Sequence, residues 1–457
     1  MHRFRRKNFL TAVGAPESIL HFSHKLWQNG RAIPLNKSRR LELESEFSKL
    51  SREGFRVLGF AFNPQADADT TLATLPPLTL GGFFAMKDPL REGVRDAVAT
   101  AARAGIRVVM ITGDHKLTAH AIAKEAGIAE HEDGVMTGEE LDTLSDTELL
   151  PRLHSVRVFA RVSPHHKLRI IELFRKRGEV VAMTGDGVND APSLAAADLG
   201  VAMGTIGTEV AKEAADVVLL DDRFENIIAA AEEGRSIYKT IKKVILYLFS
   251  TSLGEVLVIV GAIIFGLPLP MTPAQIIWLN FITDGFLVVA LAMEPKESNL
   301  LTNALDKPRR YVVDAPLLLG TIYMGTIIGV GTLFAFMDYL PTDPTKAFTM
   351  ALTVLAVFQW FNAWNCKSEI KSIFTPEFAK NKFLIGATGI VIILQMLALY
   401  HPFFQSFLHT VPLSARDWLV VTLFASSILV IEELRKLIVR AWHRPRITSF
   451  PIYEATK

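Results

Sequence analysis

Three short polar segments in the first half of the chain carry residue types that phosphoryl-transfer sites use. TGD at 112–114 and TGDGVND at 184–190 each follow an apolar run, and Lys167 opens a helix-like segment after ARVSPHH. A hydroxyl can bind phosphoryl oxygens, a lysine offsets their negative charge, and carboxylates hold Mg²⁺. These segments therefore predict a phosphoryl-transfer site that uses Mg²⁺ as a cofactor. The predicted catalytic residues are Thr112, Lys167, Asp186, Asn189 and Asp190, with Asp186 as the Mg²⁺ ligand.

Each TGD segment also has a simpler explanation, as a turn that caps the following helix. For one such segment this explanation is as good as a binding role. It does not explain why two TGD segments and Lys167 follow strand-like runs in the same region. Ligands bind at the carboxyl ends of parallel strands, so we favour a functional role for the set.

Strand-length apolar runs alternate with helix-like segments before residue 240. This alternation is typical of a parallel sheet covered by helices, and it predicts an α/β, Rossmann-like domain at residues 81–235. Residues 1–80 precede that domain, and residues 441–457 form a tail after the last apolar span. The runs are LGGFFAM (80–86), RVVMIT (107–112), VRVFAR (156–161), VVAMT (180–184), LGVAM (199–203) and VVLL (217–220).

Long apolar spans replace this pattern between residues 236 and 440. Six of them approach the ~20 residues that a helix needs to cross a bilayer. They predict an α-helical membrane domain of six transmembrane helices in contact with membrane lipid. The expected spans are 243–265, 274–293, 315–337, 347–365, 383–400 and 417–434.

Basic residues are concentrated in alternate loops of this region and after the last span. The loop GLPLPMTP at 266–273 carries no charge, whereas the loops near 296–310 and 367–382 are rich in lysine and arginine. Cytoplasmic loops carry an excess of basic residues. The distribution predicts a multi-pass protein of the cell membrane whose soluble region and C-terminus are cytoplasmic.

The first two spans contain polar groups that are costly in a bilayer, roughly 2.5–3.5 kcal/mol for a central charge. Glu255 lies in the first span, and Asn280, Thr283 and Asp284 lie in the second. Together they offer only oxygen ligands, which favour hard cations such as Ca²⁺, Mn²⁺ or Mg²⁺. Hydrogen bonding between helices is the alternative, and it explains Ser252 and Thr283 better than the two carboxylates. We therefore predict that Glu255, Asn280, Thr283 and Asp284 bind a transported cation.

Composition excludes several other classes of protein. The formal net charge of +2 gives no reason to expect a nucleic-acid partner. The single cysteine, Cys366, excludes an internal disulfide framework and a thiolate metal cluster. A mean hydropathy of +0.28 fits a chain that is partly embedded in membrane.

The motifs MKDPLREGV, MITGD, FARVSPHHK and MTGDGVNDAPSL occur in the order in which P-type ATPases carry them. From about residue 10 to the last span the chain resembles that family, whose phosphorylation domain is of the haloacid dehalogenase type. The resemblance implies ATP as the nucleotide and Mg²⁺ as the metal. It also implies that the following residues face ATP or the phosphoryl group: Asp88, Arg91, Thr112, Gly113, Asp114, Arg161 and Lys167.

GAPESIL (14–20) and GFRVLGFA (54–61) resemble the end of the family's nucleotide-binding domain. The resemblance implies that residues 1–80 are a remnant of this domain and that Arg56 reaches the nucleotide. Val13 stands where the family usually has a lysine. This departure predicts weaker contact with ATP.

The sequence contains neither the family's DKTGT segment, whose aspartate is phosphorylated, nor its TGE actuator loop. The four membrane helices that normally precede this region are also missing from it. We therefore expect the chain to correspond to the C-terminal half of a pump. Its expected partner is a separate N-terminal half that carries DKTGT.

GEV in the first span and NxxTDG in the second resemble the calcium-pump branch of the family. The resemblance implies Ca²⁺ as the transported ion, held in part by Asn280 and Asp284. Ser252 and Gln359 stand where two-site members carry asparagine and glutamate. These two departures predict one ion per transport cycle.

Two functional hypotheses follow. The first is ATP-driven cation transport, with Ca²⁺ as the preferred ion and Mn²⁺ or another hard cation as the alternative. The second is a non-catalytic membrane protein, either truncated or regulatory, and it is motivated by Val13 and by the missing DKTGT segment.

Overall fold

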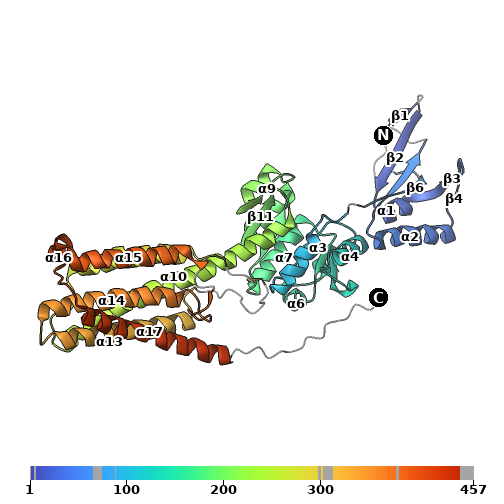
Figure 1. The fold of residues 1–457 in the computed structure, drawn as a ribbon. Coiled ribbons are helices and arrows are strands. Elements are labelled where there is room, and N and C mark those ends of the chain that lie inside the picture. The colour runs from blue at the N-terminus through green and yellow to red at the C-terminus, as the bar shows by residue number, and fades with distance from the viewer. Residues whose placement is uncertain are drawn as a thin grey trace. The chain divides into compact units, whose positions relative to one another are not determined.

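The computed structural model describes residues 2–4, 7–64, 75–87, 89–296, 300–301, 312–376 and 380–442 (Figure 1). The chain divides into two compact units. The first comprises residues 1–231 with 301–306, and the second comprises residues 232–300 with 307–457.

The first unit begins with a six-stranded sheet of order β1-β2-β5-β6-β3-β4. Helices α1 and α2 lie on one side of it (Figure 1), where Ile19 and Phe47 pack with Val57 and Ala61 of β5. The elements are β1 (His2–Phe4), β2 (Lys7–Gly14), α1 (Pro16–Phe22), β3 (Ser23–Gln28), β4 (Arg31–Pro34), α2 (Lys37–Arg52), β5 (Arg56–Asn63) and β6 (Leu78–Met86).

Strand β6 corrects one expectation from the sequence. The run 80–86 was expected to open the parallel sheet, but β6 pairs antiparallel with β5 and parallel with β3. An apolar run of this length fits either sheet equally well, so the pairing partner decides its place.

The opposite face of this sheet carries a row of aromatic side chains. Phe60 and Phe62 alternate with the buried residues of β5, so they point away from α1 and α2. Phe62 packs edge-on against Trp27, and Phe60 packs edge-on against Phe84. Trp27 is 45% exposed and Phe84 is 58% exposed, so this face is left largely open to solvent within the described residues.

Two three-stranded parallel sheets follow, one of order β7-β9-β8 and one of order β10-β11-β12. Their strands alternate with helices, which confirms the predicted α/β class. Strands β7 and β10 are each the edge strand of their sheet among the described residues. The strands are β7 (Met110–Ile111), β8 (Val135–Thr137), β9 (Val158–Ala160), β10 (Ala182–Gly185), β11 (Leu199–Met203) and β12 (Val217–Leu219).

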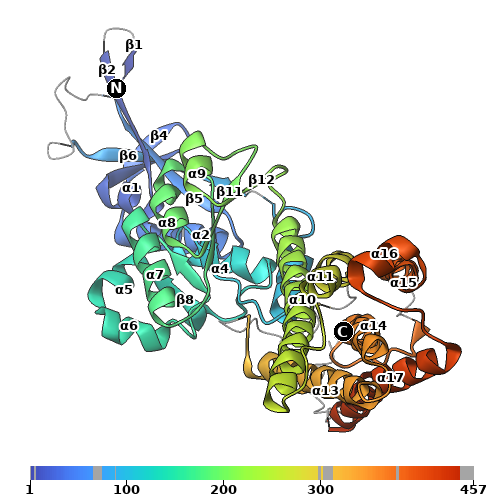
Figure 2. The same ribbon diagram turned by 90° about the vertical axis from the view of Figure 1, so that its left-hand side faces the viewer.

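Helices cover these sheets (Figure 2) and bury their apolar residues. Phe159 of β9 packs with Leu141 and Ile170, whereas Met183 of β10 packs with Ile171 and Leu194. Helix α7 therefore contributes to both cores, through neighbouring residues. The helices are α3 (Val94–Arg103), α4 (Lys116–Glu125), α5 (Gly138–Thr143), α6 (Asp146–Arg152), α7 (Pro164–Lys176), α8 (Ala191–Ala196) and α9 (Glu209–Ala214), with 3₁₀ turns η1 (Glu132–Gly134) and η2 (Val188–Asp190).

The second unit is helical, and α10 enters it from the first unit. Five of its helical segments are long and apolar enough to cross a membrane: α10, the segment 273–292, α13, α14 and α15. The elements are α10 (Phe224–Ile264), α11 (Pro273–Trp278), the π-helical segment η3 (Leu279–Asp284), α12 (Gly285–Ala292), α13 (Ala315–Tyr339), α14 (Pro344–Cys366), α15 (Lys382–Tyr400), α16 (Pro402–Leu408) and α17 (Ala415–Trp442).

The sixth expected span, 417–434, forms part of α17 but is not among these five. It contains Asp417, Glu432 and Glu433, which make it less apolar than the others. Asp417 and Glu432 are nevertheless buried against other helices. Six crossings therefore remain a prediction, while a helical membrane region is confirmed.

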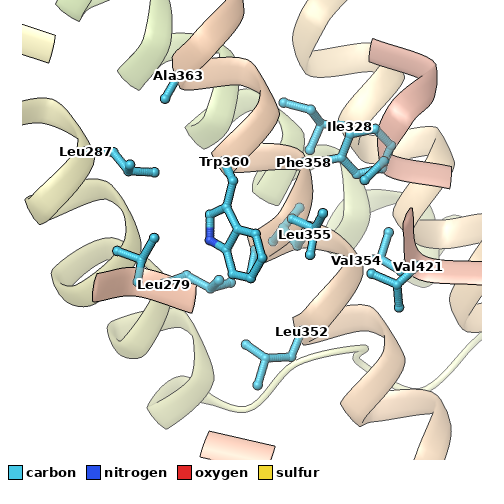
Figure 3. Close-up of a cluster of buried hydrophobic side chains, with 14 of the residues drawn as sticks. Leu279, Leu287, Ile328, Leu352, Val354, Leu355, Phe358, Trp360, Ala363 and Val421 are labelled. Carbon is cyan, nitrogen blue, oxygen red and sulfur yellow. The ribbon is translucent and has the colours of Figure 1, made fainter. Parts of the chain in front are cut away.

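Helix α14 forms the centre of this bundle. In its most apolar stretch 83% of the residues are buried, against 33–44% for the other four candidate spans. It packs against α13 and α17, beside which it lies in both views (Figures 1 and 2). Trp360 projects from α14 toward Leu279 and Leu287 (Figure 3). A helix that is buried on nearly all sides lies at the centre of its bundle.

Small residues allow α10 and α13 to approach closely. A Cβ atom on Gly254 would lie 2.6 Å from Cγ2 of Ile328, and one on Gly329 would lie 2.7 Å from Cβ of Leu257. Real Cβ atoms essentially never come so close, so only glycine fits at these positions. Close approach through small residues is a common way for membrane helices to associate.

We predict that Gly329→Leu lowers the free energy of unfolding by about 1–3 kcal/mol, because the added side chain overpacks the contact with α10. Thermal unfolding of the purified chain in detergent measures this loss. Gly389→Leu is the matched control, because a Cβ atom on Gly389 meets nothing within 4 Å. Equal loss of stability in both variants would contradict the proposed packing.

Candidate functional site

The turn after β10 is held by the buried carboxylate of Asp190. Its Oδ2 accepts hydrogen bonds from the backbone N–H of Asp186 (3.4 Å) and of Gly187 (3.3 Å). Its Oδ1 lies 2.6 Å from Nζ of Lys167, which neutralises its charge. Asp186 and Asn189 are exposed at the open end of the turn. Asp190 therefore orders the turn, and Asp186 and Asn189 are left facing outward.

Lys167 reaches Asp190 because it lies in the first turn of α7. Ser163 caps this helix by accepting a hydrogen bond from the backbone N–H of His166 at 3.4 Å, and Pro164 is its first residue. Both features favour a helix start at this point. The sequence SPHHK thus fixes where the lysine side chain emerges.

The other TGD segment lies at the end of β7, next to the end of β9. The Thr112 hydroxyl donates to Oδ2 of Asp114 at 3.0 Å. The backbone N–H of Arg161 donates to the Asp114 carbonyl oxygen, and that of Val162 donates to the Thr112 carbonyl oxygen. Arg161 has a φ of +51°, an uncommon conformation for a residue other than glycine. The structure thus brings Thr112, Gly113, Asp114 and Arg161 together.

A cavity of about 230 Å³ opens beside Arg161. Its walls include Glu17, whose carboxylate forms an ion pair with Arg161. Its other polar wall residues are Ser51, Arg56, Asp114, His115 and Thr118, together with the backbone of Gly113. The predicted nucleotide-contact residues Arg56, Gly113, Asp114 and Arg161 therefore share one cavity.

The charges in this cavity shift the pKa values of two of its residues. Burial opposes ionisation of Glu17, but hydrogen bonds from its own backbone N–H and from Arg161 outweigh it, so its pKa is lowered. Burial and the nearby charge of Arg161 lower the pKa of His115, against the smaller effect of Glu17. The cavity therefore holds a neutral histidine and an arginine partly balanced by a carboxylate near pH 7.

Arg91 does not line this cavity, and it makes its hydrogen bond elsewhere in the first unit. Its Nη1 donates to the backbone carbonyl oxygen of Asp222 at 2.7 Å. The Asp222 carboxylate accepts from the backbone N–H of Gly204 (2.7 Å), Thr205 (3.0 Å) and Ile206 (3.0 Å). Arg91 thus supports the loop between β11 and α9. Asp88, which was expected to face the same ligand, lies outside the described residues.

In the helical unit, two buried carboxylates lie within hydrogen-bond reach of neutral donors. Oε2 of Glu255 accepts from Nδ2 of Asn280 at 3.2 Å, and its Oε1 accepts from Nε2 of Gln359 at 3.0 Å. Asp284 accepts from the hydroxyl of Tyr247 at 2.6 Å and from that of Thr251 at 3.4 Å. Of the predicted cation ligands, Glu255 and Asn280 therefore contact each other directly, whereas Asp284 contacts Tyr247 and Thr251 of α10.

Three of these ligands lie on the π-helical segment η3, which comprises Leu279–Asp284. Asn280 also donates to the Ile276 carbonyl oxygen at 2.9 Å, so it bridges this segment to α11. Single turns of π-helix within α-helices are frequent at functional sites. Thr283 and Asp284 are buried, whereas Asn280 is exposed.

Sequence reasoning missed Tyr247 and Thr251. Their signal was present, because residues 247, 251 and 255 recur at the helical spacing of four and so share one face. Ser252, next to Thr251 in the chain, is exposed. In the described part of the chain, no group of three or more His, Cys, Asp or Glu side chains could hold a metal ion. Any cation here would depend on two carboxylates together with neutral oxygens.

Fold and site together define a haloacid dehalogenase-like domain joined to membrane helices with buried carboxylates. Residues 24–198 match the family model described as haloacid dehalogenase-like hydrolase. Residues 268–438 match the model described as cation transporting ATPase, C-terminus. The chain belongs to the P-type cation-transporting ATPases.

Its relatives in bacteria and yeast bear the name calcium-transporting ATPase. The chain is 39% identical to calcium-transporting ATPase 1 of Bacillus cereus over 96% of its length and 51% of that relative. It is 38% identical to the calcium-transporting ATPase of Bacillus subtilis, over 91% of this chain and 47% of the relative. It is 37% identical to calcium-transporting ATPase 1 of Saccharomyces cerevisiae, over 96% of this chain and 47% of the relative. The chain spans about half the length of these relatives.

We predict that Asp222→Asn destabilises the first unit by about 1–3 kcal/mol near pH 7, because a neutral amide holds the three N–H groups less well. Burial raises the pKa of Asp222, but the hydrogen bonds from Thr205, Ile206 and Gly204 and the charge of Arg91 outweigh it, so the pKa is lowered.

A carboxyl group with a lowered pKa stabilises the fold above its unfolded value of about 3.9, and this contribution is lost as the pH falls through the folded value. The difference between wild type and variant should therefore shrink below pH 4. Thermal unfolding of wild type and variant at pH 7 and at pH 3 measures the loss of stability at each pH. A difference of the same size at the two pH values would contradict this role for the charge.

Proposed function

We propose that this chain contributes the C-terminal part of an ATP-driven cation pump, with Ca²⁺ as the transported ion. The buried pair Glu255 and Asp284 carries the proposal most directly. Two carboxylates inside apolar helices are costly unless they serve an ion or a proton. The names of the relatives support Ca²⁺ over other hard cations.

The cytoplasmic reaction assigned to the first unit is phosphoryl transfer. Thr112 would hydrogen-bond to phosphoryl oxygens, and Lys167 would offset their charge while it orders Asp190. The exposed carboxylate of Asp186 and the amide of Asn189 are oxygen donors of the kind that Mg²⁺ prefers. Mg²⁺ bound there would neutralise charge on the transferred group. Positioning and charge neutralisation supply most of the catalysis in such reactions.

ATP is assigned to the cavity beside Arg161. Arg161 and Arg56 line it and would pair with phosphate oxygens. Glu17 now balances Arg161, so nucleotide binding would require the arginine to exchange one anion for another. Val13, 59% exposed on β2, offers no charge where the family has lysine.

The edge strands β7 and β10 indicate where the phosphorylated residue could enter. A strand that paired with both would join the two three-stranded sheets into one. Its carboxyl end would then lie near Thr112 and Asp186, at the edge where ligands of parallel sheets bind. We assign this place to a segment that carries DKTGT, supplied by a separate N-terminal half of the pump. The basic loops support a cytoplasmic location for this unit, because cytoplasmic loops carry an excess of basic residues.

A non-catalytic membrane protein is the second candidate, and the neutral Val13 favours it. The two candidate functions differ in whether supplying a DKTGT segment would produce ATP hydrolysis. Co-expression with the N-terminal half of the Bacillus cereus relative should yield Ca²⁺-stimulated ATP hydrolysis if the chain is catalytic, and Asp186→Asn should reduce the rate by at least about 100-fold. Retention of the wild-type rate by Asp186→Asn, or no stimulated hydrolysis in the wild-type pair, would favour the second candidate.

The cation site can be tested on this chain alone. We predict that Glu255→Gln and Asp284→Asn each weaken Ca²⁺ binding by at least about tenfold, since each removes one charged ligand. Radioactive Ca²⁺ binding to the purified chain in nanodiscs measures the affinity. Ser426→Ala is the control, because the Ser426 hydroxyl donates only to the local Leu423 carbonyl oxygen on α17. Unchanged affinity in both carboxylate variants would contradict the site.

A further inference from the structure

The loop between β11 and α9, residues 204–208, is tied to the segment that follows β12. Three successive backbone N–H groups of the loop, those of residues 204–206, donate to the carboxylate of Asp222. The hydroxyl of Thr205 also donates to the carbonyl oxygen of Leu220 at 3.2 Å. The loop lies outside the strands and helices, yet these four hydrogen bonds leave it few other conformations.

Two glycines let this loop pack closely against the sheet. A Cβ atom on Gly207 would lie 1.9 Å from the carbonyl oxygen of Met203 on β11, and one on Gly204 would lie 2.5 Å from that of Leu219 on β12. A larger residue at either position would fit only if the backbone moved. Hydrogen bonds and close packing therefore both fix the position of the loop.

Asp222 is itself held in an uncommon backbone conformation. Its φ is +53°, in the left-handed region that residues other than glycine seldom adopt. Such a conformation persists where the surrounding contacts determine it. One of these contacts comes from Arg91, whose Nη1 donates to the carbonyl oxygen of Asp222. Asp222 is also only 5% exposed, so its carboxylate is shielded from water while it holds the loop.

The last residue of the loop contacts the predicted Mg²⁺ ligand. The backbone N–H of Thr208 donates to the carbonyl oxygen of Asp186 at 2.8 Å. This hydrogen bond joins the loop after β11 to the turn after β10. It is shorter than the hydrogen bond from the N–H of Asp186 to Asp190, which measures 3.4 Å. The position of Asp186 therefore depends on the loop as well as on Asp190.

We propose that Asp222 is a positioning residue for the Mg²⁺ site and that it acts on Asp186 through the 204–208 loop. The proposal rests on the proposed function, because it treats Asp186 as the Mg²⁺ ligand. Asp222 fixes the first three residues of the loop, and Thr208 at its end fixes the carbonyl group of Asp186. The side chain of Asp186 is exposed, so the place of its carboxylate depends mainly on its backbone.

The loop and Asp190 hold the turn after β10 in different ways. Asp190 binds the N–H groups of the turn and connects it to α7 through Lys167. The loop binds a carbonyl group of the turn and connects it to Asp222. A metal ligand that is held from both sides loses less conformational freedom when the ion binds. Removal of either support is therefore expected to weaken metal binding.

Capping of α9 is the competing explanation for Thr208. Its hydroxyl accepts a hydrogen bond from the backbone N–H of Ala211 at 3.3 Å, as the residue before a helix commonly does. Loss of this cap would change stability without a specific effect on Asp186. The two roles use different atoms of Thr208, so two substitutions at this residue separate them.

Thr208→Pro removes both the hydroxyl and the N–H group, whereas Thr208→Ala removes only the hydroxyl and is the matched control. The φ of Thr208 is −68°, which proline adopts without strain. Gly207 precedes it, and glycine tolerates the restriction that proline imposes on its neighbour. The two variants therefore differ mainly in the contact with Asp186, which the proline ring excludes.

The first measurement is hydrogen exchange of the purified full chain in nanodiscs, followed by mass spectrometry. Thr208→Pro should speed the exchange of N–H groups in the turn 184–190 by about tenfold relative to Thr208→Ala, because the turn has lost its contact with the loop. Equal exchange in the two variants would contradict a connection between the loop and the turn.

The second measurement is Mn²⁺ binding to the same samples, with Mn²⁺ in place of Mg²⁺ and free Mn²⁺ measured by electron paramagnetic resonance. Binding that Asp186→Asn abolishes is assigned to Asp186, which separates it from binding in the helical unit. Thr208→Pro and Asp222→Asn should each weaken this binding by about tenfold, because partners that orient a metal ligand typically contribute that much. Thr208→Ala should leave the affinity unchanged.

Asp216→Asn is the control for Asp222→Asn. The carboxylate of Asp216 accepts from the backbone N–H of Gly200 on β11 at 2.8 Å, so it supports the same sheet without holding the loop. It should therefore leave Mn²⁺ binding at Asp186 unchanged. All affinities are measured at a temperature where melting curves show that the variants are folded.

Equal Mn²⁺ affinity in Thr208→Pro and Thr208→Ala would overturn the proposal. So would an equal loss of affinity in Asp222→Asn and Asp216→Asn, and this second comparison decides if Thr208→Pro does not fold. A wild-type chain without any Mn²⁺ binding that depends on Asp186 would instead overturn the Mg²⁺ site of the proposed function.

Discussion

The requirement to bury Glu255 and Asp284 among apolar helices governs how the membrane unit is built. A carboxylate away from water needs several partners, and an unpaired one would be protonated or would destabilise the bundle. Tyr247, Thr251, Asn280 and Gln359 satisfy this need from three segments of the chain. The central, largely buried position of α14 is consistent with the contact that its Gln359 makes with Glu255 on α10. The tight glycine contact of α10 with α13 holds the other side of α10 in place.

The first unit solves a related problem with backbone groups. Asp190 closes the turn after β10 and pairs with Lys167, while Asp222 holds three N–H groups of the loop after β11. In each case one buried carboxylate fixes a loop at the end of a strand. Loops ordered in this way can present exposed groups such as Asp186 in a defined position, without an apolar core of their own. After β9, the backbone N–H of Arg161 donates to the Asp114 carbonyl oxygen and so joins the ends of β9 and β7.

Sequence periodicity and motifs were sufficient to predict the α/β class, the membrane helices and the grouping of Thr112, Asp114 and Arg161. They could not show that Asp190 points inward and Asp186 outward. The direction of each side chain in this turn depends on its backbone dihedral angles, which the residue types alone do not specify. They did not identify Thr251, whose hydroxyl contacts Asp284, because neighbouring residues are separated by about 100° around a helix and the adjacent Ser252 is exposed. The run 80–86 joined another sheet, since strand partners are chosen by contacts that are distant in sequence.

The edges of the two parallel sheets have a further consequence for the behaviour of the polypeptide in a cell. In the part of the chain that the structure describes, strands β7 and β10 each have one side without a partner strand, and the aromatic face of the first sheet lies in the same unit. Open strand edges are templates for pairing with other chains. Newly made copies would therefore be prone to self-association and to capture by chaperones. The yield of folded material would depend on how soon another polypeptide covers these edges after synthesis.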